Sequence, residues 1–100
     1  MEVRFRTNKL KENYEKSESA TKAWGKEVAR KYIQRIDLIL SAQSLQELNR
    51  LPGLNYHPLK GKRKGQHAVS LKDSWRLIFT LHGDQLEIVQ IEEVSKHYGD

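Results

Sequence analysis

The apolar residues of this chain change their spacing between its first and second halves. Trp24, Val28, Tyr32 and Ile36 recur every four positions, which is the spacing of a helix with one buried face. From Val69 onward, apolar residues alternate with polar ones or form short runs rich in aromatic and β-branched side chains, a pattern typical of strands. Helices followed by hairpin-linked strands predict an α+β domain, with two N-terminal helices packed on one face of a mostly antiparallel sheet.

Capping and breaking residues set the element boundaries in the first half. Thr7-Asn8 can cap a helix, Ser44 and Glu47 have the spacing of a capping box, and Pro52-Gly53 must stop the turn that follows. Several capping residues within 17–21 predict a break between two helices. The expected elements are a short strand at 3–5, a helix at 9–16, a longer helix at 20–42 and a helical turn at 44–48.

The second half is expected to form a β-meander. Its strands are predicted at 69–71, 75–81 and 86–91, with turns at 72–74 and 82–85. The last strand is apolar on both faces, as in a central strand. We find no repeat or linker and expect a single domain over residues 1–100. The absence of cysteine and of long apolar runs predicts a cytoplasmic protein without disulfides, thiolate zinc sites or membrane contact.

Positive charge is concentrated in one segment. Residues 50–76 contain seven Lys or Arg and one acidic residue, Asp73, whereas the whole chain contains 18 basic and 13 acidic residues. The net charge of +5 therefore arises in this segment. A local cationic field attracts polyanions, so nucleic acid is the first partner to consider.

Residues 56–79 resemble the HigB branch of the RelE/ParE superfamily of bacterial toxins, also called the plasmid maintenance killer family. The resemblance rests on three motifs, His57-Pro-Leu-Lys-Gly61, Arg63-Lys-Gly65 and Trp75-Arg76. It implies a toxin of a type II toxin-antitoxin system, acting as a ribosome-dependent mRNA endoribonuclease and neutralised by a HigA-like helix-turn-helix antitoxin. The chain departs from the family pattern at His67, where relatives commonly carry a large aromatic residue.

RNA cleavage without a metal or cofactor needs a base for the 2′-hydroxyl, an acid for the leaving 5′-oxygen, and cations beside the phosphorane. Histidine suits both proton-transfer roles because its reference pKa is about 6.5. We expect the catalytic residues to be His57, Arg76, His97 and Tyr98, with Arg76 forking across the scissile phosphate. Which histidine is acid and which is base stays open. The residues expected to bind RNA phosphates are Lys60, Lys62, Arg63, Lys64 and Lys96.

Structural alternatives exist for several of these residues. Arg76 could pair with Glu92 or Glu93 across the sheet, and His67 fits a half-buried strand position better than a catalytic one. The four histidines lack the spacing of a metal site, such as an i, i+4 pair. The competing hypothesis is a non-catalytic RelE/ParE-fold toxin or a nucleic-acid-binding module. The joint presence of the basic turn at residues 60–64, Arg76 and two candidate histidines favours the nuclease.

Overall fold

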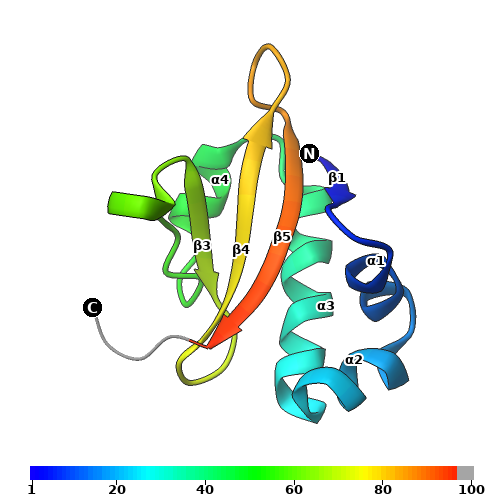
Figure 1. Cartoon of the computed structure of the whole chain (residues 1–100). Coiled ribbons are helices and arrows are strands. Elements are labelled where there is room, and N and C mark those ends of the chain that lie inside the picture. Colours follow the sequence, from blue (N-terminus) through cyan, green and yellow to red (C-terminus); the bar gives the residue numbers. More distant parts are fainter. Residues whose placement is uncertain (97–100) are drawn as a thin grey trace.

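The computed structural model describes residues 1–96, in which helices are followed by a meander of strands (Figure 1). The helices are α1 (Asn8–Glu15), α2 (Ser17–Trp24), α3 (Lys26–Ser41) and α4 (Leu45–Arg50), with a short 3-10 turn, η1, at Gly61–Arg63. The strands are β1 (Glu2–Phe5), β2 (His57–Pro58), β3 (Gln66–Ser70), β4 (Trp75–His82) and β5 (Ile88–Lys96). The predicted α+β class is confirmed.

The strands form one sheet in the order β1-β5-β4-β3-β2. Strands β2 to β5 pair antiparallel with their sequence neighbours, and β1 pairs parallel with β5. The sheet is therefore mostly antiparallel, as expected. The pairing of β4 with β5 is interrupted between Ile78 and Phe79, where Ile78 faces Glu93 but Phe79 faces Ile91. Glu92 is the extra residue of this bulge, which is a local kink in one strand.

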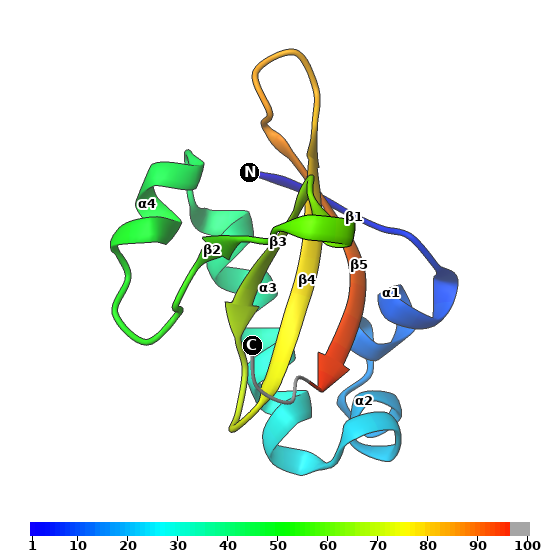
Figure 2. The same cartoon turned by 60° about the vertical axis from the view of Figure 1, so that its left-hand side comes forward.

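The core lies between α3 and one face of the sheet. Figures 1 and 2 show α1, α2 and α3 on the same side of the strands. Helix α3 buries Val28, Tyr32, Ile36 and Ile39 at helical spacing, and the sheet supplies apolar partners from β3, β4 and β5. The Tyr32 hydroxyl donates to the Leu10 carbonyl at 2.7 Å, which ties α1 to α3. Alternate strand residues, including Arg76, consequently point to the opposite face of the sheet.

The helix expected over residues 20–42 is divided into α2 and α3. The break is at Gly25, whose φ of 88° and ψ of 162° lie in a region that is essentially restricted to glycine. Trp24 ends α2 and packs its ring edge-on against Tyr32, with the ring centroids 4.6 Å apart. The apolar period continues across Gly25 because both helices bury residues against the same core, and this continuity concealed the break.

Two further boundaries differ from the sequence-based expectation. Leu86, predicted to open the last strand, lies in the β4–β5 turn with φ of 56° and is 53% exposed. Strand β5 begins at Ile88, and it is an inner strand with mixed burial instead of being apolar on both faces. At α4, Ser44 makes no side-chain cap, although Glu47 accepts a hydrogen bond from the Gln43 backbone N–H at 3.0 Å. No helix within residues 1–96 is long and apolar enough to cross a membrane.

Candidate active site

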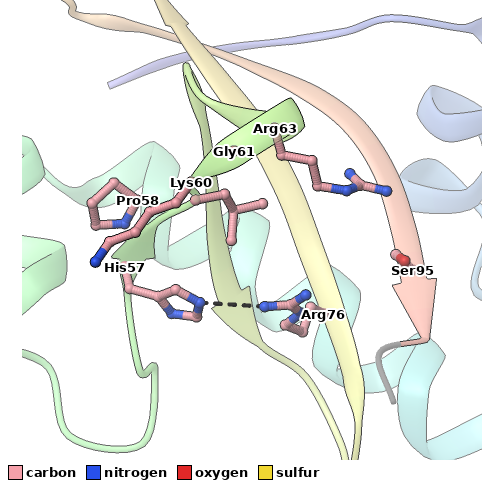
Figure 3. Close-up of a pocket in the computed structure, with 8 residues that line it drawn as sticks. His57, Pro58, Lys60, Gly61, Arg63, Arg76 and Ser95 are labelled. Atoms are coloured by element: carbon pink, nitrogen blue, oxygen red, sulfur yellow. Dashed lines mark hydrogen bonds between the residues drawn. The ribbon is translucent and has the colours of Figure 1, made fainter. Parts of the chain in front are cut away.

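A pocket of about 620 Å³ lies beside β2 and η1, on the sheet face away from α3. Its lining comes from β2, the basic turn after it, β4 and β5 (Figure 3). The lining residues are His57, Pro58, Leu59, Lys60, Gly61, Arg63, Arg76 and Ser95. The fold therefore brings together four of the residues singled out from the sequence, namely His57, Lys60, Arg63 and Arg76.

His57 is held by hydrogen bonds at both ring nitrogens. Its Nδ1 lies 2.9 Å from the Asn55 carbonyl oxygen, and its Nε2 lies 3.3 Å from Nη1 of Arg76 (Figure 3). A carbonyl oxygen only accepts and a guanidinium only donates, so Nδ1 carries the proton and Nε2 accepts. These partners favour the tautomer with its proton on Nδ1, in which the Nε2 lone pair accepts from Arg76 at the pocket wall. A group in this state can take up a proton.

Arg76 enters the pocket from β4, opposite Ser95 of β5 and Ser70 of β3. The alternative that Arg76 forms an ion pair with Glu92 or Glu93 is wrong. Glu92 Oε1 instead lies 3.4 Å from Nε of Arg6, and Glu93 Oε1 lies 3.5 Å from Nη2 of Arg63. The strand register explains the difference, because Glu93 faces Ile78 and not Arg76. Within residues 1–96, no carboxylate forms an ion pair with Arg76. Its positive charge is therefore not neutralised by the sheet.

The Arg76 guanidinium is only partly satisfied by the protein. Its Nη1 donates to His57, whereas its Nε is buried and has no hydrogen-bond partner. Burying a donor without a partner is unfavourable. The half-buried stem restricts the freedom of the side chain, so its head is held more firmly than that of a lysine in a loop.

The basic turn presents its cations in different directions. Arg63 donates to Gln66 Oε1 at 2.9 Å and reaches Glu93 on β5, so its head lies over the sheet (Figure 3). Lys60 lines the pocket, but its ammonium group points away from Arg76. Lys62 and Lys64, also expected to bind RNA, are exposed and do not line this pocket.

The remaining predicted residues fall at the C-terminal end. His97 and Tyr98 lie outside the described residues. Lys96 ends β5, is exposed, and places its Nζ 5.9 Å from the centroid of the Trp75 ring. It lies at the C-terminal end of β5 and is not part of the pocket lining.

His67 is a half-buried strand residue, as expected from the sequence. Its ring stacks between Tyr56 and Phe79, with centroid distances of 5.7 and 5.5 Å, and its Nδ1 lies 2.8 Å from the Tyr56 hydroxyl. Burial lowers the pKa of His67. His82, at the other end of β4, contacts the Thr80 hydroxyl at 2.8 Å and is also remote from the pocket lining.

Sequence reasoning missed the residues that support His57. Asn55 has a left-handed backbone with φ of 50°, and Asn is one of the few residues that tolerate it. Its position just before the His57 motif was the available signal. Arg35 of α3 was also missed: it is buried and donates to the Ser70 carbonyl at 3.0 Å. Burial lowers its pKa.

The pocket does not offer a metal-binding set. Within the part of the chain that the structure describes, no three His, Cys, Asp or Glu side chains are grouped so that they could hold a metal ion. The polar atoms of the pocket are instead an imidazole, two guanidinium groups, an ammonium group and a hydroxyl. This set can bind a phosphate and exchange a proton with it or with a neighbouring hydroxyl.

Comparisons with known proteins agree with this architecture. A family model described as the RelE-like toxin of the type II toxin-antitoxin system HigB matches residues 3–93. Comparison with curated protein sequences finds no match.

Solved structures show the same fold at low sequence identity. YafQ from E. coli strain BL21(DE3) superposes with a TM-score of 0.59 at 16% identity, covering 95% of this chain and 91% of YafQ. The YoeB/ParE toxin from Agrobacterium tumefaciens superposes with a TM-score of 0.58 at 17% identity, covering 98% of this chain and 100% of the toxin. A chain of the YoeB-YefM complex from Staphylococcus aureus gives 0.54 at 17% identity, with 98% of each chain covered.

Proposed function

This chain belongs to the RelE-like HigB toxins of type II toxin-antitoxin systems, and from this premise we propose that it is a ribosome-dependent endoribonuclease that cuts mRNA without a metal. The observation that carries the proposal is the contact between Nε2 of His57 and the Arg76 guanidinium inside a cationic pocket. A proton acceptor beside a phosphate-binding group is what internal cleavage of an RNA strand requires.

The proposed reaction is transfer of the phosphorus from the 5′-oxygen to the neighbouring 2′-oxygen. The 2′-hydroxyl loses its proton as the 2′-oxygen attacks phosphorus, the bond from phosphorus to the 5′-oxygen breaks, and the leaving 5′-oxygen gains a proton. One histidine serves as base and the other as acid, with His57 and His97 as the candidates. Arg76 offsets the additional negative charge on the phosphorane, because a guanidinium donates two parallel hydrogen bonds to phosphate oxygens. The products are a 2′,3′-cyclic phosphate and a 5′-hydroxyl.

The cations around the pocket support an RNA substrate. Lys60 and Arg63 lie at its rim, where they can hold phosphates on either side of the scissile bond. Lys62, Lys64 and Lys96 lie beyond the pocket lining. We assign them to longer-range attraction of ribosomal or messenger RNA, because exposed cations act through screened fields over about 10 Å or less. Tyr98 is proposed to stack on a base or to orient a proton carrier.

The family also suggests the biological context. We propose that residues 1–100 form a single toxin domain that acts in the cytoplasm and is neutralised by a HigA-like helix-turn-helix antitoxin. The YoeB-YefM complex from Staphylococcus aureus is a fold relative in complex with its partner, which supports an antitoxin here.

The proposal is tested by inducing the protein in cells. Wild-type protein is expected to arrest growth, and a primer-extension map of transcripts after brief induction should show new ends within translated regions. His57→Ala and His97→Gln should each relieve the arrest and abolish these ends. His82→Ala is the matched control, because it removes an imidazole from β4 outside the pocket lining. Growth arrest without new transcript ends would instead identify a toxin that acts by binding alone.

A further inference from the structure

Asn55 occupies an unusual backbone conformation next to the proposed catalytic residue. Its φ of 50° is left-handed, a region that asparagine tolerates and most other non-glycine residues do not. The conformation directs the Asn55 carbonyl oxygen at Nδ1 of His57, two residues ahead, at 2.9 Å. A residue in this uncommon conformation whose carbonyl meets a functional side chain is a candidate for a positioning role.

Ser70 of β3 holds Asn55 in this conformation. The Asn55 side-chain amide donates to the Ser70 hydroxyl at 3.2 Å, and the Ser70 backbone N–H donates to the Leu54 carbonyl at 2.7 Å. The Ser70 carbonyl in turn accepts from the buried Arg35 of α3 at 3.0 Å. The segment before β2 is therefore fastened to β3, and through β3 to the main helix.

Ser70 also lies next to Arg76, the second group that contacts the His57 ring. Ser70 pairs with Arg76 in the register of β3 and β4, and Arg76 contacts Nε2 of His57. One ring nitrogen of His57 thus meets the Asn55 carbonyl and the other meets the Arg76 guanidinium. Together these two contacts set both the tautomer and the direction of the imidazole.

We propose that Asn55 is a positioning residue that makes His57 the general base, by holding Nδ1 protonated against its left-handed carbonyl and leaving Nε2 without a proton beside Arg76. This rests on the proposed endoribonuclease function and resolves which histidine takes which role. As the Arg76 guanidinium turns from Nε2 to the phosphate, the 2′-hydroxyl proton passes to the freed Nε2 of His57 while the 2′-oxygen attacks phosphorus. The resulting imidazolium keeps its Nδ1 proton on the Asn55 carbonyl, and a separate acid protonates the leaving 5′-oxygen.

The test compares Asn55→Ala with Asn55→Gly in the full chain. Both variants lose the amide bond to Ser70 but keep the backbone bond from Ser70 to the Leu54 carbonyl. Alanine is strained at positive φ and should let the backbone turn the carbonyl away, whereas glycine adopts this region readily and keeps the carbonyl in place. The tautomer of His57 is read by NMR correlations between ring protons and nitrogens in protein labelled with ¹⁵N-histidine. Single-turnover cleavage of mRNA on programmed ribosomes then gives the maximal rate and the half-saturating concentration separately.

In wild-type protein and in Asn55→Gly, the His57 proton should be on Nδ1 and absent from Nε2, with cleavage rates within about threefold of each other. Asn55→Ala should lose this tautomer, and its maximal rate should fall by about tenfold to a hundredfold at unchanged half-saturation. Asp73→Ala is the control for backbone strain, because Asp73 also has a left-handed φ, of 53°, but lies in the β3–β4 turn outside this pocket. It should match wild type in both measurements.

Several results would overturn the assignment. An unchanged tautomer in Asn55→Ala, or a changed tautomer with an undiminished rate, removes the positioning role while leaving the nuclease intact. Equal impairment of Asn55→Gly and Asn55→Ala would show that the amide side chain matters and the carbonyl does not. Absence of cleavage by the wild-type protein would overturn the proposed function itself.

Discussion

His67 should make the stability of this protein depend on pH, and His67→Phe should remove that dependence. The ring lies between Tyr56 and Phe79, and its Nδ1 meets the Tyr56 hydroxyl at 2.8 Å. Burial lowers the pKa of His67 below its ordinary value, because a charged imidazole would lose hydration between two aromatic rings.

The direction of the effect follows from the protons bound in each state. In the unfolded chain His67 titrates near a pKa of about 6.5, whereas in the folded chain it titrates at a lower pH. Between these two values the unfolded state binds more protons, so the free energy of unfolding falls as the pH falls. The loss is at most about 1.4 kcal/mol per pH unit and stops growing below the folded pKa.

Phenylalanine should change little at high pH. Losing the hydrogen bond to Tyr56 costs about 0.5–1.5 kcal/mol. The contacts of the new phenylalanine ring with Tyr56 and Phe79 each stabilise the fold by a similar amount, which offsets this cost. Urea denaturation of wild type and His67→Phe between pH 5 and 8 isolates His67, because the other titrating groups are common to both proteins. We expect similar stability at pH 8 and a growing advantage for the variant below about pH 6.5. Parallel curves over the whole range would refute the reasoning.

Three other substitutions test separate parts of the account. Arg76→Lys keeps the charge but removes the planar fork and the Nη1 contact with His57, so the single-turnover cleavage rate should fall by about tenfold or more; a rate within about twofold of wild type would contradict this. Arg63→Gln should reduce the slope of log affinity against log salt for RNA by about 0.7. It should cost less than about 1 kcal/mol of stability, because its pairing with Glu93 is exposed to solvent; an unchanged salt slope would mean that Arg63 makes no phosphate contact. Gly25→Ala should lower the free energy of unfolding in urea by about 1–3 kcal/mol from backbone strain alone, since a Cβ there would meet no atom within 4 Å. Equal stability would show that this backbone is not strained.

The periodicity of the sequence was sufficient to predict the fold class. Core positions on α3 and on the strands repeat at spacings of about four and two because burial on one face requires it. Val28, Tyr32 and Ile36 are all buried, as are Val69 and Leu77 on the sheet. Family resemblance and physical pattern therefore pointed to the same α+β arrangement.

Boundaries that depend on one residue could not be predicted in this way. Gly25 divides a continuous apolar period, and a lone glycine in a helical pattern costs only about 1 kcal/mol, so the pattern does not reveal a break. Leu86 is apolar and β-compatible, yet hairpin geometry places it in the turn. In both cases the backbone conformation of one residue sets the boundary.

Four of the nine residues predicted for the site line the pocket, but their contacts were not predicted. The grouping of His57 with Arg76 and the basic turn followed from the motif, whereas the ion pairs of Glu92 and Glu93 followed from strand register. A bulge shifts that register by one residue, and one residue reverses which face a side chain occupies. The tautomer of His57 depends on the Asn55 backbone, which no spacing rule predicts.

The chemical ends of the cleaved RNA test the central claim most directly. Purified protein is incubated with ribosomes carrying a defined mRNA, and the new ends are analysed by mass spectrometry. The account predicts a 2′,3′-cyclic phosphate and a 5′-hydroxyl, both lost when His57 is replaced by alanine or when the nucleotide before the cut lacks its 2′-hydroxyl. A 3′-hydroxyl with a 5′-phosphate, or cleavage that survives removal of the 2′-hydroxyl, would contradict it.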